Sequence, residues 1–146
     1  MNSINVKIKR VDKSLPLPKY KSKGAVALDL CARETITVKP NEIQYIPLNV
    51  ILQIPDNCWV LVAPRSSTHK LGIIQANSMG IGDRDFCGEN DEYKFPALNY
   101  TAKEVVIEKG TRIAQMMILH FVPVVFEETE TMLNSSRGGF GSTGLK

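Results

Sequence analysis

The sequence predicts an all-β protein, folded as a compact barrel or jelly roll, and three observations support this prediction. Short runs of β-branched and apolar residues follow one another along the chain, separated by turn signals such as Pro55-Asp56-Asn57 and Lys109-Gly110. Apolar residues do not repeat at helical spacing over three turns in any segment. The chain of 146 residues has the length of one domain, and no linker divides it. A single domain built from strands is therefore expected.

The predicted strands follow in order, each with its own pattern. The first alternates polar and apolar residues, the second is apolar, and the third is rich in Ile and Val and is interrupted by Pro47. The later segments are β-branched or apolar runs between turns. About ten strands are expected. The clearest segments are Val6–Val11, Ala25–Leu30, Ile43–Ile54, Cys58–Ala63, Tyr93–Leu98, Glu104–Ile107 and Ile113–Leu119.

Two segments depart from the strand pattern. The only helix predicted is a short turn at Ser66–Leu71, because Pro64 precedes it and Gly72 follows it. After Phe126 the chain becomes polar and then rich in glycine, with few residues to bury. We therefore expect residues 1–128 to form the domain and residues 129–146 to form a mobile C-terminal arm.

The composition excludes several classes of protein. Its 43% hydrophobic and 23% charged residues are typical of a soluble globular chain. No apolar run approaches the roughly 20 residues of a membrane span, and the start carries no secretory signal, so a cytoplasmic protein is expected. The net charge of +3 is small, and the basic segment Lys7–Lys23 lacks interleaved aromatic residues, so no nucleic-acid partner is expected. Three cysteines without a CxxC pair predict reduced thiols rather than zinc ligands.

The glycine-rich end of the chain is the first candidate for ligand binding. The glycines from Gly138 to Gly144 let the backbone approach a ligand closely, while Ser142 and Thr143 offer hydrogen-bond donors to phosphate oxygens. A disordered terminus is the alternative. Phe140 favours a closing lid, because an aromatic ring can stack on a base.

The segment Ala63–Ile73 is the second candidate. Here a predicted strand leads into a short turn that carries Arg65, the hydroxyls of Ser66 and Ser67, and exposed backbone N–H groups. Such a turn can bind phosphate. The alternative is an N-capped helical turn with a surface arginine, and the segment alone does not separate the two.

The segment Asn77–Glu89 is the third candidate. Glycines flank two acids, Asp83 and Asp85, and an aromatic residue follows them, which is the pattern of a hairpin whose turn exposes its backbone. A carboxylate in that turn could orient a water for attack. A plain hairpin turn with solvated acids is the alternative.

Taken in order, these segments resemble the five motifs of the trimeric deoxyuridine triphosphatase (dUTPase) family. The resemblance extends from Ala25 to Gly144, and the fourth and fifth motifs are the most specific. The five motifs are Val26–Leu30, Ala63–Ser67, Gly80–Gly88, Gly110–Gln115 and Gly138–Gly144.

The resemblance implies an all-β fold of the distorted jelly-roll or β-clip type, assembled as a homotrimer. Each active site would take motifs from all three chains and would hydrolyse dUTP to dUMP and pyrophosphate with Mg²⁺. The arm of residues 129–146 would close over such a site. Asp83 would hold and deprotonate the attacking water, and Asp29 would bind Mg²⁺ through water. The phosphates would be held by Arg65, Ser66, the backbone N–H of Ser67, and Gln115.

The resemblance also implies how base and sugar are recognised. Backbone groups of the third motif, including Gly80, would pair with uracil, and Asn77 would be a side-chain partner. Phe86 would pack under the deoxyribose and leave no room for a 2′-hydroxyl. From the arm, Phe140 would cover the uracil, and the next residues, Gly141 and Ser142, would contact the substrate.

The chain departs from the usual family pattern at several positions. Phe86 replaces a tyrosine, which keeps the steric filter but removes a hydroxyl, and a glycine is commoner at Ser67. Gly82 replaces an apolar residue and is expected to loosen the hairpin. Arg137 lies three residues before Phe140, whereas the family's phosphate-clamping arginine usually lies five before. We still expect Arg137 to bind substrate.

Two other functions fit parts of the sequence. A dCTP deaminase, or a bifunctional deaminase and dUTPase, shares the trimeric fold and can use a catalytic glutamate, for which Glu89 is the candidate. The motif around Asp83 and the tail Gly138–Gly144 favour the triphosphatase. The other alternative is a nucleotide-binding regulator without turnover. The presence of both Asp29 and Asp83 argues against it, because such a protein would be free to lose these carboxylates.

Overall fold

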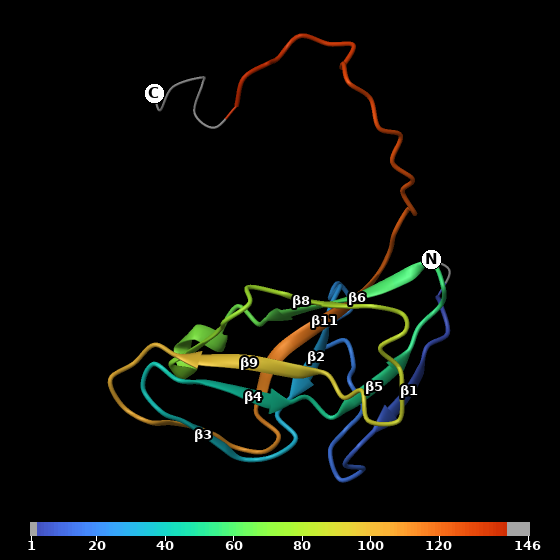
Figure 1. Cartoon of the computed structure of the whole chain (residues 1–146). Helices are drawn as coiled ribbons and strands as arrows, with labels where there is room; N and C mark the ends of the chain where they lie inside the picture. Colours follow the sequence, from blue (N-terminus) through green and yellow to red (C-terminus); the bar gives the residue numbers. More distant parts are fainter. Residues whose placement is uncertain (1–2, 140–146) are drawn as a thin grey trace.

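The computed structural model describes residues 3–139, and it confirms the all-β prediction (Figure 1). In this part of the chain the only helix is a 3₁₀ turn, η1 (Thr68–Leu71), which lies within the predicted turn Ser66–Leu71. The strands are β1 (Lys7–Arg10), β2 (Leu28–Cys31), β3 (Ile36–Val38), β4 (Ile43–Pro47), β5 (Val50–Gln53), β6 (Cys58–Pro64), β7 (Ile73–Gln75), β8 (Gly80–Gly82), β9 (Lys94–Asn99), β10 (Val105–Ile107) and β11 (Arg112–His120).

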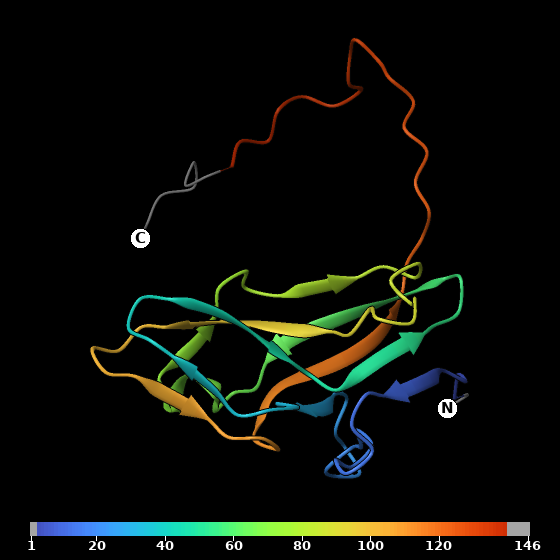
Figure 2. The same ribbon diagram turned by 60° about the horizontal axis from the view of Figure 1, so that its bottom comes forward.

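The strands pair into antiparallel sheets as a distorted jelly roll (Figures 1 and 2). The largest sheet has four strands in the order β2-β11-β6-β8, and a second has three in the order β4-β9-β7. Two further pairs, β1 with β5 and β3 with β10, complete the fold. Strands far apart in the sequence, such as β2 and β11, are therefore neighbours, and this brings distant motifs to the same sheet.

One hydrophobic core joins the sheets. Leu30 and Val60 come from the four-stranded sheet, while Ile46 and Phe95 come from the three-stranded sheet, and all four belong to the same buried cluster. None of these side chains is more than 1% exposed. Burial of apolar surface is the main stabilising contribution to such a fold. The core therefore fixes the sheets, and the loops at their ends, relative to one another.

The sequence did not predict three strands, β3, β7 and β8. Each has only three residues, which are too few to reveal an alternating pattern. In β8, glycines occupy both ends, and glycine disfavours strands, so the pairing with β6 decides its conformation. The predicted second strand was also too long, because residues 25–27 lie outside β2.

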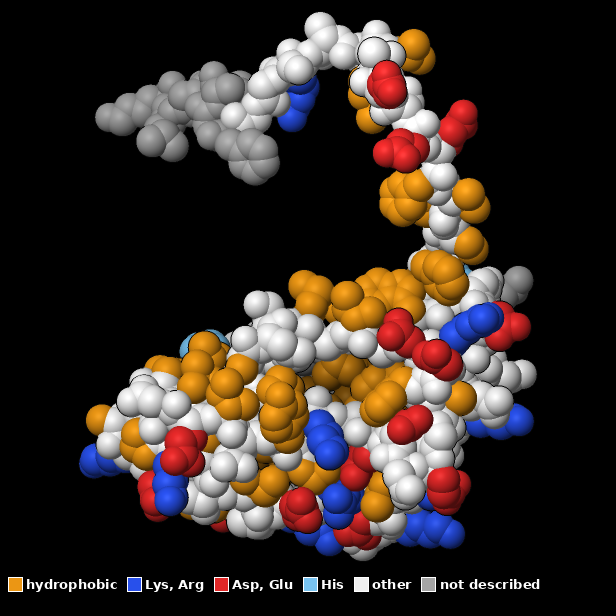
Figure 3. Space-filling view, viewed as in Figure 1, with side chains coloured by type: hydrophobic (Ala, Val, Ile, Leu, Met, Phe, Trp, Pro, Cys, Tyr) orange, Lys and Arg blue, Asp and Glu red, His pale blue; other side chains and the backbone are white. Residues whose placement is uncertain are grey.

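Residues 121–139 follow β11 and leave the body of the domain (Figures 1 and 2). Hydrophobic side chains lie uncovered along this segment in Figure 3. Val125 and Phe126 are 94% and 93% exposed, and Met132 and Leu133 are exposed as well. Contiguous apolar residues with this exposure mark surfaces that bind other proteins. The segment is therefore suited to packing against another chain.

Candidate active site

A pocket of about 260 Å³ lies where β2, β11 and the end of β6 meet. We call it the Arg65 pocket. Its lining comes from the first, second and fourth sequence motifs, together with two residues of the preceding loop, Lys21 and Ala25. The residues that line it are Lys21, Ala25, Val26, Ala27, Asp29, Arg65, Ser66, Arg112 and Gln115. The structure thus brings together Asp29, Arg65, Ser66 and Gln115.

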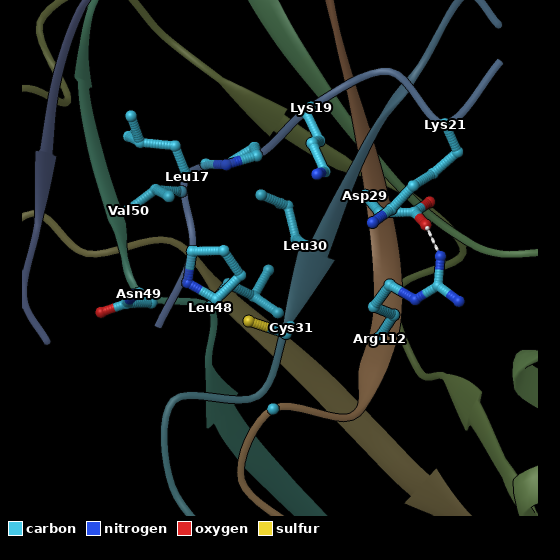
Figure 4. A pocket seen from close by; sticks show the side chains of 13 residues that line it. Leu17, Lys19, Lys21, Asp29, Leu30, Cys31, Leu48, Asn49, Val50 and Arg112 are labelled. Atoms are coloured by element: carbon cyan, nitrogen blue, oxygen red, sulfur yellow. Dashed lines mark hydrogen bonds and ion pairs between the residues drawn. The ribbon is translucent and has the colours of Figure 1, made fainter. Parts of the chain in front are cut away.

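Two arginines hold the carboxylate of Asp29 in this pocket. Arg65 Nε donates to Asp29 Oδ1 at 3.1 Å, and Arg112 Nη1 donates to Asp29 Oδ2 at 2.7 Å. Figure 4 shows Arg112 and Asp29 pointing toward one another, with Lys21 beside them. The Asp29 side chain is only 13% exposed, so these ion pairs are partly shielded from water. Asp29 therefore has a fixed position and orientation.

The fold also fixes Arg65 and Gln115. Gln115 lies opposite Asp29 in the β2–β11 ladder and donates from Nε2 to the Pro64 carbonyl at 3.0 Å. At the end of β6, the backbone N–H of Arg65 donates to Thr68 Oγ1 at 2.9 Å. Thr68 is buried and donates in turn to the Ile113 carbonyl at 2.7 Å. These bonds tie the turn after β6 to β11.

Ser66 and Ser67 lie between Arg65 and the 3₁₀ helix η1. Ser67 is the N-cap of this helix but makes no side-chain capping bond, so the alternative of an N-capped turn does not account for its hydroxyl. Ser66 is exposed and lines the pocket. Both hydroxyls therefore remain available to a ligand.

Sequence reasoning missed two cations of the Arg65 pocket, Arg112 and Lys21. Arg112 could have been identified, because it lies within the Gly110–Gln115 motif. Lys21 lies in no motif, so nothing in the sequence marked it as a site residue. With Arg65, three cationic side chains surround one carboxylate, so the pocket carries net positive charge. That balance suits a polyanionic ligand.

A second group of predicted residues lies on β8 and the segments that flank it. Asn77 lies in the turn before β8, and Gly80 begins the strand. Asp83 follows directly and lines a separate pocket with Trp59 and Phe121. None of these residues lines the Arg65 pocket. The structure therefore places the predicted site residues in two separate groups.

The predicted hairpin at Asn77–Glu89 is only partly right. A tight turn is present at the two acids, in which the Phe86 N–H donates to the Asp83 carbonyl at 3.2 Å. The strands on either side do not pair with each other, however. β8 pairs with β6, and the next strand, β9, pairs with β4 and β7. The turn therefore crosses from one sheet to another and exposes its backbone.

The strand register shows how far apart the two groups lie. Gly82 faces Val60 in the β6–β8 ladder, so Asp83 lies level with Trp59 near the start of β6. Arg65 follows the last residue of that strand. The six residue-to-residue steps from Trp59 to Arg65 span about 20 Å at roughly 3.3 Å per residue. Within one chain, Asp83 and Arg65 are too far apart to act on the same phosphorus atom.

Gly82 was expected to loosen the hairpin, and the structure shows that this glycine has a packing role. A Cβ at Gly82 would lie 2.5 Å from Tyr93 Cε1 and 2.8 Å from Cζ, so the tyrosine ring fills the space that a side chain would occupy. The same ring packs edge-to-face on Phe86, with centroids 5.3 Å apart. Burial raises the pKa of Tyr93 to about 12, and the nearby Asp83 carboxylate adds to this shift. Tyr93 thus supports both Phe86 and the end of β8.

Replacing Gly82 by alanine is expected to destabilise the protein by about 1–3 kcal/mol, because the buried Tyr93 ring must move. Urea unfolding should show a lower midpoint with an unchanged slope. Gly24→Ala is the matched control, since a Cβ there meets no atom within 4 Å. An unchanged midpoint for Gly82→Ala would show that the ring does not depend on this glycine.

Two further predicted residues, Glu89 and Arg137, lie outside both groups. Glu89, the candidate for a deaminase, is an exposed residue that forms an ion pair with Lys9 of β1. Arg137 lies in the exposed segment that follows β11. Phe140, Gly141 and Ser142 lie outside the described residues.

Known proteins resemble this chain over most of its length. A family model described as dUTPase matches residues 13–144. The deoxyuridine 5'-triphosphate nucleotidohydrolase of Rickettsia prowazekii is 40% identical over 151 residues, covering 99% of this chain and 100% of that protein. The SPbeta prophage-derived deoxyuridine 5'-triphosphate nucleotidohydrolase of Bacillus subtilis is 42% identical over 121 residues, covering 82% of this chain and 84% of that protein.

The fold has a counterpart among solved structures. A mutant dUTPase of Staphylococcus bacteriophage 80alpha, solved with dUpNHpp, superposes with a TM-score of 0.85 at 20% sequence identity. The match covers 98% of this chain and 100% of that chain.

Within residues 3–139, no helix has the length and apolar character needed to cross a membrane.

Proposed function

This chain belongs to the dUTPase family, and on that premise we propose that it is an enzyme that hydrolyses dUTP to dUMP and pyrophosphate. The observation that carries the proposal is the Arg65 pocket. Three family motifs meet there and place cations, a hydroxyl and an amide around one fixed carboxylate. Phosphoryl transfer depends mainly on positioning and on neutralising charge at the phosphate oxygens, and this pocket supplies both.

We propose that the working enzyme is a homotrimer in which each site draws on different chains. The separation of about 20 Å along β6 supports this assembly, because Asp83 of one chain must meet the Arg65 pocket of another. The exposed apolar residues after β11 also suit contact with a neighbouring chain. A closed ring of identical subunits would satisfy both requirements with one repeated interface.

In the proposed complex the Arg65 pocket binds the triphosphate. Arg65 uses Nε and Nη1 within the protein and has Nη2 free of protein partners in residues 3–139, so Nη2 can donate to a phosphate oxygen. The Ser66 hydroxyl and the Ser67 N–H donate to neighbouring oxygens, and Gln115 contributes its amide. The C-terminal arm then closes over the substrate. Arg137 reaches the phosphates, Phe140 covers the uracil, and Gly141 and Ser142 complete the contact.

Asp83 acts as the general base. Its carboxylate holds a water molecule and accepts a proton as the water oxygen attacks the α-phosphorus. The new bond joins the water oxygen to that phosphorus, and the bond to the bridging oxygen breaks to release pyrophosphate. Attack at this atom can be checked with ¹⁸O-labelled water, which should place the label in dUMP and leave pyrophosphate unlabelled.

Nucleoside recognition falls to the β8 region. Backbone groups from Gly80 onward and the side chain of Asn77 bind uracil. Phe86 packs against the deoxyribose, and the edge-to-face contact with Tyr93 holds its ring in place. A 2′-hydroxyl would meet that ring, so UTP is excluded by steric contact rather than by charge.

Magnesium is the proposed cofactor, and the residues of the pocket fit it. No cluster of three or more His, Cys, Asp or Glu side chains able to hold a metal occurs among residues 3–139, and Asp29 is the single carboxylate in the pocket. This donor set suits an ion that is bound mainly by substrate phosphates, with Asp29 accepting hydrogen bonds from its waters. When bound, Mg²⁺ would neutralise charge on the phosphate oxygens.

Asp29→Asn is expected to raise the Mg²⁺ concentration that gives half-maximal activity by about tenfold, because the amide orients the ion's waters less well than a carboxylate. Asp56→Asn is the control, since Asp56 is 96% exposed and lies in a different part of the surface. The measurement is a Mg²⁺ titration at saturating dUTP. An unchanged titration for Asp29→Asn would remove Asp29 from the metal site.

The reaction itself is tested with the wild-type chain and four nucleotides, namely dUTP, dCTP, dTTP and UTP, in the presence of Mg²⁺. Pyrophosphate is expected to be released far faster from dUTP than from the other three nucleotides. Release of ammonia from dCTP would instead identify a deaminase.

We place the enzyme in the cytoplasm, a reducing compartment that matches the free thiols of Cys31, Cys58 and Cys87.

A further inference from the structure

Gln75 is a buried polar residue at a position where the strand pattern calls for an apolar one. In β7 the side chains alternate, so that Ile73 and Gln75 point inward while Ile74 points outward. Gln75 is only 6% exposed. Its amide lies directly under the turn before β8, and a Cβ on Gly80 would lie 3.8 Å from Nε2. The chain therefore maintains a buried amide beside the residues that bind uracil.

The nitrogen and the oxygen of the Gln75 side-chain amide have different hydrogen-bond surroundings. Nε2 donates to Asn77 Oδ1 at 3.0 Å and lies 3.4 Å from the Val62 carbonyl, which also accepts from it. Oε1 is buried and has no hydrogen-bond partner in the described residues. An unpaired buried acceptor is unfavourable, so the donor end must provide a compensating benefit. Because a backbone carbonyl can only accept, Val62 fixes Nε2 on the side of Asn77.

This arrangement determines which end of the Asn77 amide faces outward. Oδ1 accepts the bond from Gln75, and Nδ2 bonds to no atom of residues 3–139. Asn77 is exposed and its backbone is held in the turn, where its carbonyl accepts from the Met79 N–H at 2.7 Å. Asn77 thus has an NH₂ group that can donate to a ligand, while its oxygen is held by Gln75.

We infer that Gln75 is a specificity-determining positioning residue, which holds the Asn77 amide with its NH₂ group toward the base and so favours uracil over cytosine. The inference rests on the proposed function. Uracil carries a carbonyl at C4, which accepts from Nδ2, whereas cytosine carries an amino group, which would face Nδ2 donor to donor. A free asparagine could rotate its amide and accept from cytosine, and Gln75 prevents this rotation.

The inference is tested by a double-mutant cycle on the ratio of kcat/KM for dUTP to kcat/KM for dCTP. Gln75→Met keeps the length of the side chain and removes both polar ends. We expect it to lower the ratio by about tenfold, mainly through dUTP. Asn77→Ala should lower the ratio at least as much, and the double variant should match Asn77→Ala, because Gln75 acts only through Asn77. Gln53→Met, at an exposed position of β5, is the control and should leave the ratio unchanged.

Two results would overturn the inference. One is an unchanged ratio in Gln75→Met, and the other is a loss that persists in full in the Asn77→Ala background, which would indicate a packing effect. The amides can also be observed without catalysis, in side-chain ¹⁵N spectra of the wild type. The Gln75 NH₂ protons should be protected from exchange and those of Asn77 should exchange rapidly, and the reverse order would contradict the inference. Absence of any turnover by the wild type would refute the proposed function and leave this spectroscopic test intact.

Discussion

Asp83→Ala is expected to lower kcat for dUTP hydrolysis by about 10²–10⁴-fold, the usual contribution of a general base. According to the structure, this substitution should affect catalysis without affecting stability. Asp83 is exposed at the end of β8 and forms no ion pair within residues 3–139, so its loss should leave the unfolding midpoint unchanged. KM should change little, because the water rather than the nucleotide loses its partner. Steady-state kinetics with saturating Mg²⁺ provide the measurement.

The control for Asp83 is its neighbour in the same turn. Asp85 lines the same pocket and is equally exposed, but the resemblance assigns it no role in water activation. Asp85→Ala should retain kcat within a few-fold. If Asp83→Ala turned over dUTP at the wild-type rate, the mechanism would be wrong even though the activity were right. If both variants lost activity equally, the charge of the whole turn rather than one base would be responsible.

Arg65→Met is the second substitution with a large expected effect. It removes a charge-assisted donor to the triphosphate, and each such hydrogen bond contributes about 1.5–3 kcal/mol, so KM should rise by about ten- to a hundredfold. It also leaves Asp29 paired with Arg112 alone. We therefore expect weaker binding of a non-hydrolysable dUTP analogue together with a smaller fall in kcat. Calorimetric titration and steady-state kinetics distinguish these two effects.

Arg84→Met is the matched control for Arg65. Arg84 is an exposed arginine that pairs with Asp56 at 3.4 Å, and it lies on the Asp83 side of the chain. Exposed ion pairs contribute little, so this variant should bind the analogue as the wild type does. Equal losses in both variants would mean that general positive charge, rather than the Arg65 pocket, attracts the nucleotide.

The sequence predicted those features that depend on short local patterns. Cys58–Ala63 forms most of β6 because it is an apolar run between turn signals, and η1 forms between Pro64 and Gly72 as the turn signals indicated. Asp29, Arg65, Ser66 and Gln115 were named from their motifs and lie in one pocket. The motifs were sufficient to name these four residues without any information on side-chain contacts.

Other features depend on strand order, which no local pattern contains. The predicted hairpin failed because β8 and β9, the strands on either side of its turn, belong to different sheets. Gly82 was expected to loosen the chain, but Tyr93 fills its space from a distant segment. The sequence analysis did not identify Gln75 as functional, because a single glutamine among apolar residues forms no recognisable motif. Its importance follows only from its burial and from the bond to Asn77.

The central claim of this account is that one active site is built from different copies of the chain, with Arg65 from one and Asp83 from another. It explains why a single chain holds the two groups at positions separated along β6. The direct test mixes two variants, Asp83→Ala, for which we expect a much lower kcat, and Arg65→Met, for which we expect a much higher KM. They are denatured together at equal concentration, refolded and assayed with dUTP at a concentration far below the KM of Arg65→Met.

The account predicts recovery of about a quarter of the wild-type activity. In randomly mixed assemblies, half of the Arg65 pockets are intact and half of the intact ones meet an intact Asp83. Each variant refolded alone should show no such recovery. If the mixture were no more active than the sum of the two variants, Arg65 and Asp83 would have to act within one chain, and the shared site would be contradicted.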